Sequence, residues 1–308
     1  MKKLLITGGL GHIGSRLIRE LLQQDYYVVC IDNFLTERIV SLRGVITHNN
    51  FKFHEADVSK DKETIAKLFK KNNFYSAIHL SAITNAEKSH DLAKEVINNN
   101  LDGTKTLIEL CNDHKTRIIF PSSTSIYGTS EEVVHEDEER FINPQSPYAE
   151  CKVMEENLIK GCSSLNSVIL RLGTIFGTSP GMRFHTAVNK FCWQAVASKP
   201  ITIWKTAFHQ YRPYLDLSDA CNSFRFFLDN EVPSGSTYNI TTTNFTVAQI
   251  IDNIKKYVPE LDLEFVDSKI MNQLSYRVLN NKVKSLGFSF KGNLDLAIKS
   301  TIDWLKEE

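Results

Sequence analysis

The sequence predicts an α/β protein built around a parallel β-sheet. Over the first 173 residues, short apolar runs alternate with stretches in which apolar residues recur at helical spacing, which is typical of βαβ units. A glycine-rich segment at 7–14 directly follows the first apolar run and precedes a helical pattern. With 308 residues, of which 42% are hydrophobic, the chain can bury a large core.

Six short apolar runs are the expected strands of this sheet, at 3–7, 27–32, 51–57, 77–81, 117–122 and 167–172. Between them, apolar residues three and four apart predict helices, as at Ile13, Leu17 and Leu21. A later helix has a clear start, because Ser146 can serve as N-cap and Pro147 fits the first helical position. This order of elements predicts a Rossmann-type, doubly wound parallel sheet.

The pattern changes after Gly173, where we place a domain boundary. Residues 174–308 are expected to form a smaller α+β domain, and 174–215 look irregular and rich in aromatic residues. A helix is expected at 217–229. The chain therefore divides into 1–173 and 174–308, with the helix at 217–229 returning to the first domain.

The composition argues against several classes of partner. Lys+Arg and Asp+Glu both count 36, so the net charge is zero, which disfavours nucleic acid and an anionic membrane. No apolar run reaches the roughly 18 residues that span a bilayer, and the N-terminus reaches its glycines too soon for a signal peptide. The six cysteines are scattered and the nine histidines show no ligand-like spacing. We expect a reduced, cytoplasmic protein without a metal site.

The glycine-rich segment satisfies both the GxGxxG and the GxxGxxG patterns. Glycines let the backbone turn tightly against a pyrophosphate, which then lies at the positive N-terminus of the following helix. The preceding strand and the amphipathic helix are the context that this motif requires. The segment therefore predicts a dinucleotide site formed by Gly8, Gly11, His12, Ile13 and Gly14.

Two acidic residues are candidates for the adenosine half of the dinucleotide. Asp32 lies 18 residues after Gly14 (32 − 14), where a carboxylate accepts both ribose hydroxyls of NAD and repels the 2′-phosphate of NADP. Its alternative role is a turn formed with Asn33. Asp57 and Val58 can meet the adenine amino group, unless Asp57 only caps a helix or a turn. NAD is therefore the expected cofactor.

Ser123, Tyr148 and Lys152 are the candidate catalytic residues. Tyr148 and Lys152 lie four residues apart in one predicted helix, so they project from the same face. A free phenol, with a pKa of about 10, is a poor base at neutral pH, and a neighbouring ammonium lowers that pKa by stabilising the phenolate. Lys152 can also bond the nicotinamide ribose, and Ser123 the reacting oxygen. The YxxxK pattern is common by chance, and its combination with Asp32 and the glycine segment gives it weight.

With these residues the chain resembles the extended short-chain dehydrogenases/reductases of the nucleotide-sugar epimerase/dehydratase family, nearly from end to end. Further segments that carry the resemblance are 79–82, 100–104, 122–128, 171–177, 212–219 and 286–288. It implies bound NAD, a nucleoside-diphosphate sugar as substrate, and a homodimer formed through helices near 100–114 and 148–162. It also implies cofactor contacts from Leu80, Ser81, Ala82 and Asn100.

Departures from the family pattern separate its branches. In the 4,6-dehydratases, the residue corresponding to Ser123 precedes an Asp-Glu pair that performs the elimination, and here Thr124-Ser125 stands in that place. Decarboxylating members need Glu in place of Ser125. The epimerase-reductases that make GDP-fucose have Cys there and generally use NADP. The branch that remains epimerises at C4. In that reaction the C4 hydride is transferred to NAD, the 4-keto sugar rotates, and the hydride returns to the opposite face of the sugar.

Substrate contacts are expected from both parts of the chain: Ser123, Thr124, Tyr148, Thr174, Asn189, Arg212, Tyr276 and Arg277. Arg212 is the candidate for the diphosphate, because a planar guanidinium matches phosphate oxygens, and its alternative role is an ion pair. Thr174 stands where the family often has Asn, and Gln273-Leu274 where relatives tend to carry an Arg. The resemblance aligns Tyr276 with the family position that gates bulky N-acetyl sugars, which implies an unacetylated hexose, unless Tyr276 is a packing aromatic. His185 is expected to be a structural loop residue.

Two other functions stay open. An NAD(H)-dependent reductase or dehydrogenase of a keto-sugar nucleotide would use the same Ser123, Tyr148 and Lys152, and would exchange its cofactor at each turnover. A non-catalytic, dinucleotide-sensing protein on this fold would typically lose the Tyr or the Lys, and this chain keeps both. The leading hypothesis is an NAD-dependent C4 epimerase of a nucleoside-diphosphate sugar.

Overall fold

The large sheet of this computed structural model has seven strands, and all neighbouring strands run parallel. Residues 1–36, 39–84, 92–128, 133–267 and 275–307 are described. The strand order is β11-β7-β5-β4-β1-β2-β3. The bounds are β1 (Lys3–Thr7), β2 (Tyr27–Asp32), β3 (Phe51–Glu55), β4 (Ser76–His79), β5 (Arg117–Ser123), β7 (Ser167–Leu172) and β11 (Ser236–Ile240).

The strand order reverses at the centre of the sheet. β1 lies between β2 and β4, so the chain first builds one side of the sheet and then the other. Leu4, Leu5 and Ile6 are consecutive and fully buried, because helices cover both faces of a parallel sheet. Ligands bind at the carboxyl ends of strands beside such a reversal. The loops after β1, β4 and β5 therefore form the place for a site.

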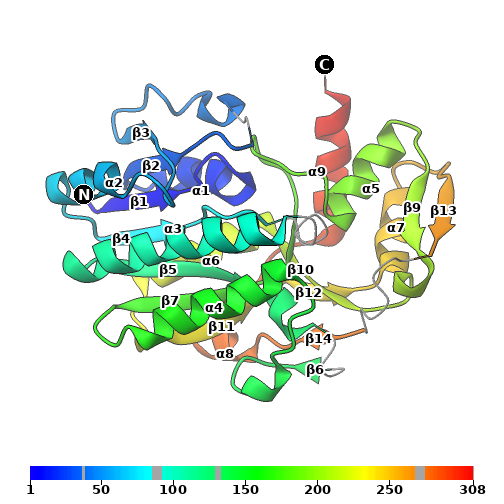
Figure 1. The fold of residues 1–308 in the computed structure, drawn as a ribbon. Helices are drawn as coiled ribbons and strands as arrows, with labels where there is room; N and C mark the ends of the chain where they lie inside the picture. Colours follow the sequence, from blue (N-terminus) through cyan, green and yellow to red (C-terminus); the bar gives the residue numbers. More distant parts are fainter. Residues whose placement is uncertain (37–38, 85–91, 129–132, 268–274, 308) are drawn as a thin grey trace.

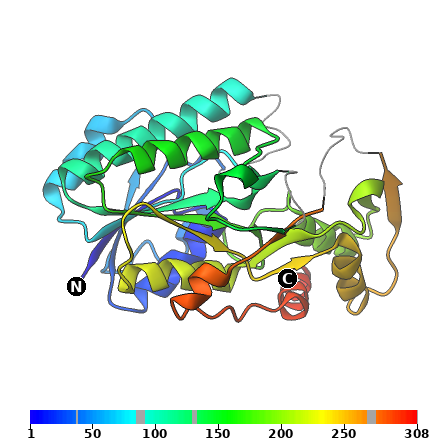
Figure 2. The same cartoon turned by 90° about the horizontal axis from the view of Figure 1, so that it is seen from below.

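Helices cover both faces of this sheet (Figure 1 and Figure 2). One face packs against α1 (His12–Leu22) and α6 (Leu217–Asp229), where Leu17 and Phe224 join one apolar cluster. The opposite face packs against a second cluster that contains Leu107 and Ile159. Its helices are α2 (Lys62–Lys71), α3 (Ala93–Asp113) and α4 (Pro147–Gly161).

The remaining elements form smaller sheets and a third apolar cluster. The sheet β12-β10-β8 lies between the large sheet and a group containing α5, α7 and α9 (Figure 1). The strands are β6 (Val133–Val134), β8 (Thr174–Phe176), β9 (Ile201–Trp204), β10 (Arg212–Asp216), β12 (Thr243–Phe245), β13 (Leu263–Val266) and β14 (Arg277–Val278). The helices are α5 (Ala187–Val196), α7 (Val247–Lys255), α8 (Asn281–Ser285) and α9 (Leu294–Lys306), with 3-10 turns η1 (Ile39–Leu42), η3 (Thr124–Tyr127), η4 (Glu139–Phe141) and η5 (Lys205–Ala207).

The predicted α/β class and the six predicted strands are confirmed, with shifts at strand ends. The third strand stops at Glu55 rather than 57, because Asp57 accepts hydrogen bonds from Ser59 in a turn. The expectation that 174–215 is irregular is wrong, since this region contains β8, α5, β9 and the first residues of β10. The buried residues of α5 have helical spacing: Val188, Phe191, Cys192 and Ala195. This periodicity predicts a helix, but the many aromatic residues of the region made it hard to recognise.

Strand β11 comes from the second half of the chain and joins the edge of the large sheet. It pairs with β7 from Ser236↔Val168 to Ile240↔Leu172, and α6 packs against α1. The expected division at residue 173 anticipated the return of the helix at 217–229 but not that of the strand. No helix within the described ranges is long and apolar enough to cross a membrane.

Candidate active site

The loop between β1 and α1 passes close to neighbouring backbone. Gly8 has φ +67°, and a Cβ placed there would lie 2.5 Å from the amide nitrogen of Ser81. A Cβ on Gly14 would lie 2.6 Å from the Cα of Gly9, so only glycine permits this approach of helix to loop. His12, Ile13 and Gly14, the first residues of α1, line the cavity beyond. The loop therefore has the shape and the N-terminal dipole of a pyrophosphate cradle.

Asp32 and Asp57 line a small hollow beside this loop. Its wall comprises most of the residues predicted to contact the cofactor: Gly8, Gly11, Asp32, Asn33, Asp57, Val58, Leu80, Ser81 and Ala82. The Asp32 carboxylate accepts hydrogen bonds from the amides of Leu10 and Phe34, each at 3.0 Å. Asn33 donates to Asp57 at 3.1 Å. Both carboxylates hold turns and also face the hollow, so the turn and the cofactor roles are compatible.

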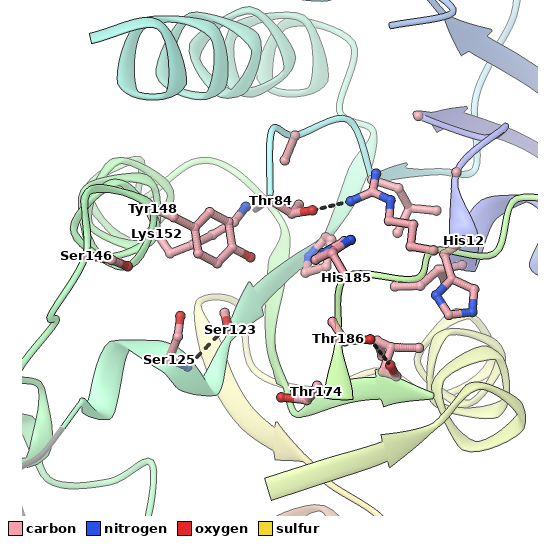
Figure 3. A pocket seen from close by; sticks show the side chains of 18 of the residues that line it. His12, Thr84, Ser123, Ser125, Ser146, Tyr148, Lys152, Thr174, His185 and Thr186 are labelled. Carbon is pink, nitrogen blue, oxygen red and sulfur yellow. Dashed lines mark hydrogen bonds between the residues drawn. The ribbon is translucent and has the colours of Figure 1, made fainter. Parts of the chain in front are cut away.

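Ser123, Tyr148 and Lys152 meet in the adjoining larger cavity of about 450 Å³ (Figure 3). Ser123 is the last residue of β5, and its Oγ accepts a hydrogen bond from the Ser125 amide at 3.1 Å. Tyr148 and Lys152 project from the first turns of α4. The Ser146 side chain caps this helix by accepting from the Ala149 amide at 3.2 Å, and Pro147 is its first residue, as predicted.

The protonation of this cluster depends on burial and on its ion pairs. Desolvation raises the pKa of Tyr148, while the Lys152 ammonium and a hydrogen bond with Ser123 oppose that rise. Burial alone would lower the pKa of Lys152, but Glu155, Tyr148 and Cys151 together raise it above the ordinary value, with Glu155 as the largest of these contributions. Lys152 is therefore an ammonium and Tyr148 a phenol at neutral pH. His79, beside them, is neutral, because burial and then Lys152 lower its pKa to about 3.

The larger cavity is cationic. Lys152, Arg183 and Arg212 line it, and its described wall contains no carboxylate. The guanidinium of Arg212 lies 5.2 Å from the centre of the Tyr276 ring, and the Tyr276 hydroxyl donates to the carbonyl oxygen of Thr124 at 3.3 Å. A multiply charged anion, such as a diphosphate, is the ligand that this wall favours.

Thr174, Arg212 and Tyr276 join the catalytic cluster as predicted lining residues of the cavity, whereas Thr124 and Arg277 do not. The Thr124 hydroxyl donates to the carbonyl oxygen of Leu172 at 3.2 Å, inside the protein. Arg277 is exposed, and its guanidinium lies 4.1 Å from the centre of the Tyr211 ring. The neighbouring Gln273-Leu274 departure lies outside the described residues.

Asn100 and Asn189 also lie outside the walls of both hollows, and both have structural contacts. The Asn100 amide bonds to the backbone N–H and C=O of Ile83, at 2.8 and 3.1 Å. Asn189 accepts from the Gly177 amide at 3.2 Å and donates to the Arg183 carbonyl oxygen at 3.1 Å. These residues shape segments that border the cavity, and direct ligand contacts from them stay predictions.

Several lining residues were not found from the sequence. Arg183 lines both hollows and donates a hydrogen bond to Thr84, 99 positions earlier in the chain. His185, which the sequence favoured as a structural loop residue, lines the larger cavity, as does Trp204. Pro180-Gly181 signals a turn in this segment, but no sequence spacing indicates that the turn packs on the glycine loop. That packing places Gly181 against the backbone of Gly11.

The fold and the paired hollows define a dinucleotide-binding protein of the short-chain dehydrogenase/reductase class. Residues 4–241 match the model of the NAD dependent epimerase/dehydratase family, so the chain belongs to that family. NAD is its cofactor, which confirms the cofactor that the sequence predicted. The glycine cradle and the Asp32 carboxylate fit this cofactor. Within the described ranges, no cluster of three His, Cys, Asp or Glu residues could hold a metal ion.

The relatives include both dehydratases and epimerases. A trifunctional UDP-glucose 4,6-dehydratase/3,5-epimerase/reductase of Arabidopsis thaliana is 27% identical over 98% of this chain, which spans 47% of that protein. A UDP-glucose 4-epimerase of Dictyostelium discoideum is 29% identical over 58% of this chain and 53% of its own length. The crystal structure of a Thermotoga maritima UDP-glucose 4-epimerase superposes with TM-score 0.89 at 21% identity, covering 99% of this chain and 98% of that one, and so shares the fold.

Proposed function

We propose that this protein epimerises a nucleoside-diphosphate sugar at C4. The observation that carries the proposal is that Ser123, Tyr148 and Lys152 face a cationic cavity whose described wall contains no carboxylate. Dehydration of a 4-keto sugar requires removal of the proton on the carbon next to the ketone and protonation of the leaving hydroxyl. Those steps need an acid and a base beyond Tyr148, whereas C4 epimerisation needs none.

The residues divide the work as follows. Tyr148 removes the proton of the C4 hydroxyl and later returns it to the ketone oxygen. Lys152 stabilises the phenolate, and Ser123 donates a hydrogen bond to the reacting oxygen. Arg212 holds the diphosphate while the sugar turns. Bound NAD supplies the chemistry of accepting and returning the C4 hydride.

The test is to incubate the purified protein in heavy water with UDP-, GDP- and CDP-hexoses. An internal hydride transfer predicts a C4 epimer without deuterium at any carbon. A 4-keto-6-deoxy product carrying deuterium would contradict the proposal and indicate dehydration. Consumption of added NADH in proportion to product would contradict it in favour of an exchanging reductase.

The matched control is Tyr148→Phe, which removes only the phenolic oxygen. We expect turnover to fall by about 10²- to 10⁴-fold, the range typical for loss of a general acid/base. Mass spectrometry of the dinucleotide released on denaturation should still find NAD. Full activity in Tyr148→Phe would contradict a catalytic role for this site.

A further inference from the structure

Glu155 forms a buried ion pair with the catalytic lysine. Its Oε2 lies 3.0 Å from Lys152 Nζ, three residues earlier on α4, and the two side chains are 0% and 4% exposed. Its Oε1 accepts a hydrogen bond of 2.5 Å from the hydroxyl of Thr104 on α3. Both carboxylate oxygens therefore have partners, and the side chain is fixed between two helices.

The next residue, Glu156, is equally buried but acts elsewhere. It accepts hydrogen bonds of 2.9 and 2.7 Å from Arg171 on β7. Helix α4 thus carries two adjacent buried carboxylates with different partners, and only Glu155 faces the catalytic cluster. Stability alone does not require a charge at position 155, because replacing a buried ion pair by well-packed apolar side chains often leaves the free energy of unfolding unchanged.

Within the part of the chain that the structure describes, few other charges reach this cluster from the surrounding elements. His79 on β4 is neutral, and burial raises the pKa of the Cys151 thiol on α4 to about 12, so that it stays protonated. Ser123 on β5 contributes a hydroxyl. Arg183, from the segment before α5, also lowers the pKa of Tyr148, and Arg212 lines the same cavity. Lys152 and Glu155 together therefore contribute nearly no net charge beside the phenol.

We propose that Glu155 is a positioning residue that holds the Lys152 ammonium and offsets its charge, so that the phenol form of Tyr148 is favoured over the phenolate. An ion pair with no net charge stabilises a neighbouring phenolate less than an unpaired ammonium does. Glu155 accordingly acts with desolvation to raise the pKa of Tyr148, against Lys152. The inference rests on the proposed role of Tyr148 as the acid/base.

Glu155→Gln tests the inference, because the amide keeps the shape and can still accept a hydrogen bond from Lys152. The titration of Tyr148 is followed by phenolate absorbance, as the difference between each purified protein and its Tyr148→Phe version. We expect the midpoint in Glu155→Gln to fall by about one pH unit, which is a tenfold larger phenolate fraction below the midpoint. Glu155→Asp, which keeps the charge, should stay near the wild-type midpoint. An unchanged or higher midpoint in Glu155→Gln overturns the inference.

Two further variants serve as a substitute and a control for Glu155→Gln. Glu155→Ala leaves room for water beside the ammonium and replaces Glu155→Gln if the latter does not fold, with the same expected direction. Glu109→Gln removes an exposed carboxylate of α3 that pairs with Lys62 and should not move the midpoint. Because the titration needs no sugar, a shifted midpoint in a protein without epimerase activity contradicts only the proposed function. An active epimerase without the shift contradicts only the role of Glu155.

Discussion

Burial decides the protonation of single side chains in this site, and His79 is the clearest case. Its Nδ1 lies 2.7 Å from the hydroxyl of Thr7, at the end of β1, and the ring is 2% exposed. Burial, and then the nearby Lys152 ammonium, lower the pKa of His79 to about 3. A neutral imidazole lets Lys152 keep its charge without repulsion from a second cation.

This neutrality predicts a pH-dependent loss of stability. Between about pH 6.5, the ordinary value, and about pH 3, the unfolded chain binds a proton at His79 that the folded chain does not. The free energy of unfolding therefore falls with decreasing pH, by up to about 1.4 kcal/mol per unit from this residue. His79→Asn should show a shallower slope in urea denaturation between pH 6.5 and 4.5. Parallel slopes for the two proteins would contradict a neutral His79.

Among the elements, α4 and β7 are joined by a buried polar network. Arg171 on β7 pairs with Glu156 and also donates to the Tyr127 hydroxyl at 2.9 Å. Tyr127 in turn donates to Asn239 on β11 at 2.7 Å. The helix that carries Tyr148 and Lys152 is thus fixed to two strands of the large sheet by charged and neutral hydrogen bonds.

Removing one member of this network should be costly. Glu156→Gln leaves the Arg171 guanidinium, 1% exposed, without a counter-charge. We expect the free energy of unfolding to fall by about 3 kcal/mol, since breaking a buried pair leaves an uncompensated charge. Lys160→Ala is the control, because this half-exposed lysine also contacts Glu156, at 3.5 Å, and should cost less than about 1 kcal/mol. Equal losses in the two variants, measured by urea denaturation, would refute the special role of Arg171.

For the whole molecule, the expected homodimer would join copies through α3 and α4, which lie side by side (Figure 2). Met154 and Leu158 on α4 are 44% and 36% exposed, and because they lie four residues apart they share one face of the helix. A dimer that covers them gains by their burial.

A double variant tests this assembly. Met154→Glu with Leu158→Glu introduces charges into the expected interface, so sedimentation should detect a monomer where the wild type is a dimer. Leu296→Glu on α9, where the side chain is 64% exposed, should leave the assembly unchanged. A monomeric wild type would refute the expectation.

Features confined to one strand–loop–helix unit could be predicted from the sequence. The glycine segment and the placement of Tyr148 and Lys152 on one helical face depend only on local geometry and fixed spacing. The Asp57 turn was among the alternatives for the same reason. NAD could be predicted because a single carboxylate, Asp32, distinguishes the two dinucleotides.

Contacts between distant segments could not be predicted in this way. The return of β11 to the large sheet, the packing of Arg183 against Thr84 and the outward position of Arg277 depend on how whole elements pack. The sequence by itself determined the fold class and the cofactor, and it predicted the placement of Tyr148 and Lys152 on one helix, because each depends on residues that are close together in the chain. Only the tertiary structure decided which carboxylate of α4 reaches Lys152, because Glu155 and Glu156 differ in sequence by one position but point to different packed elements.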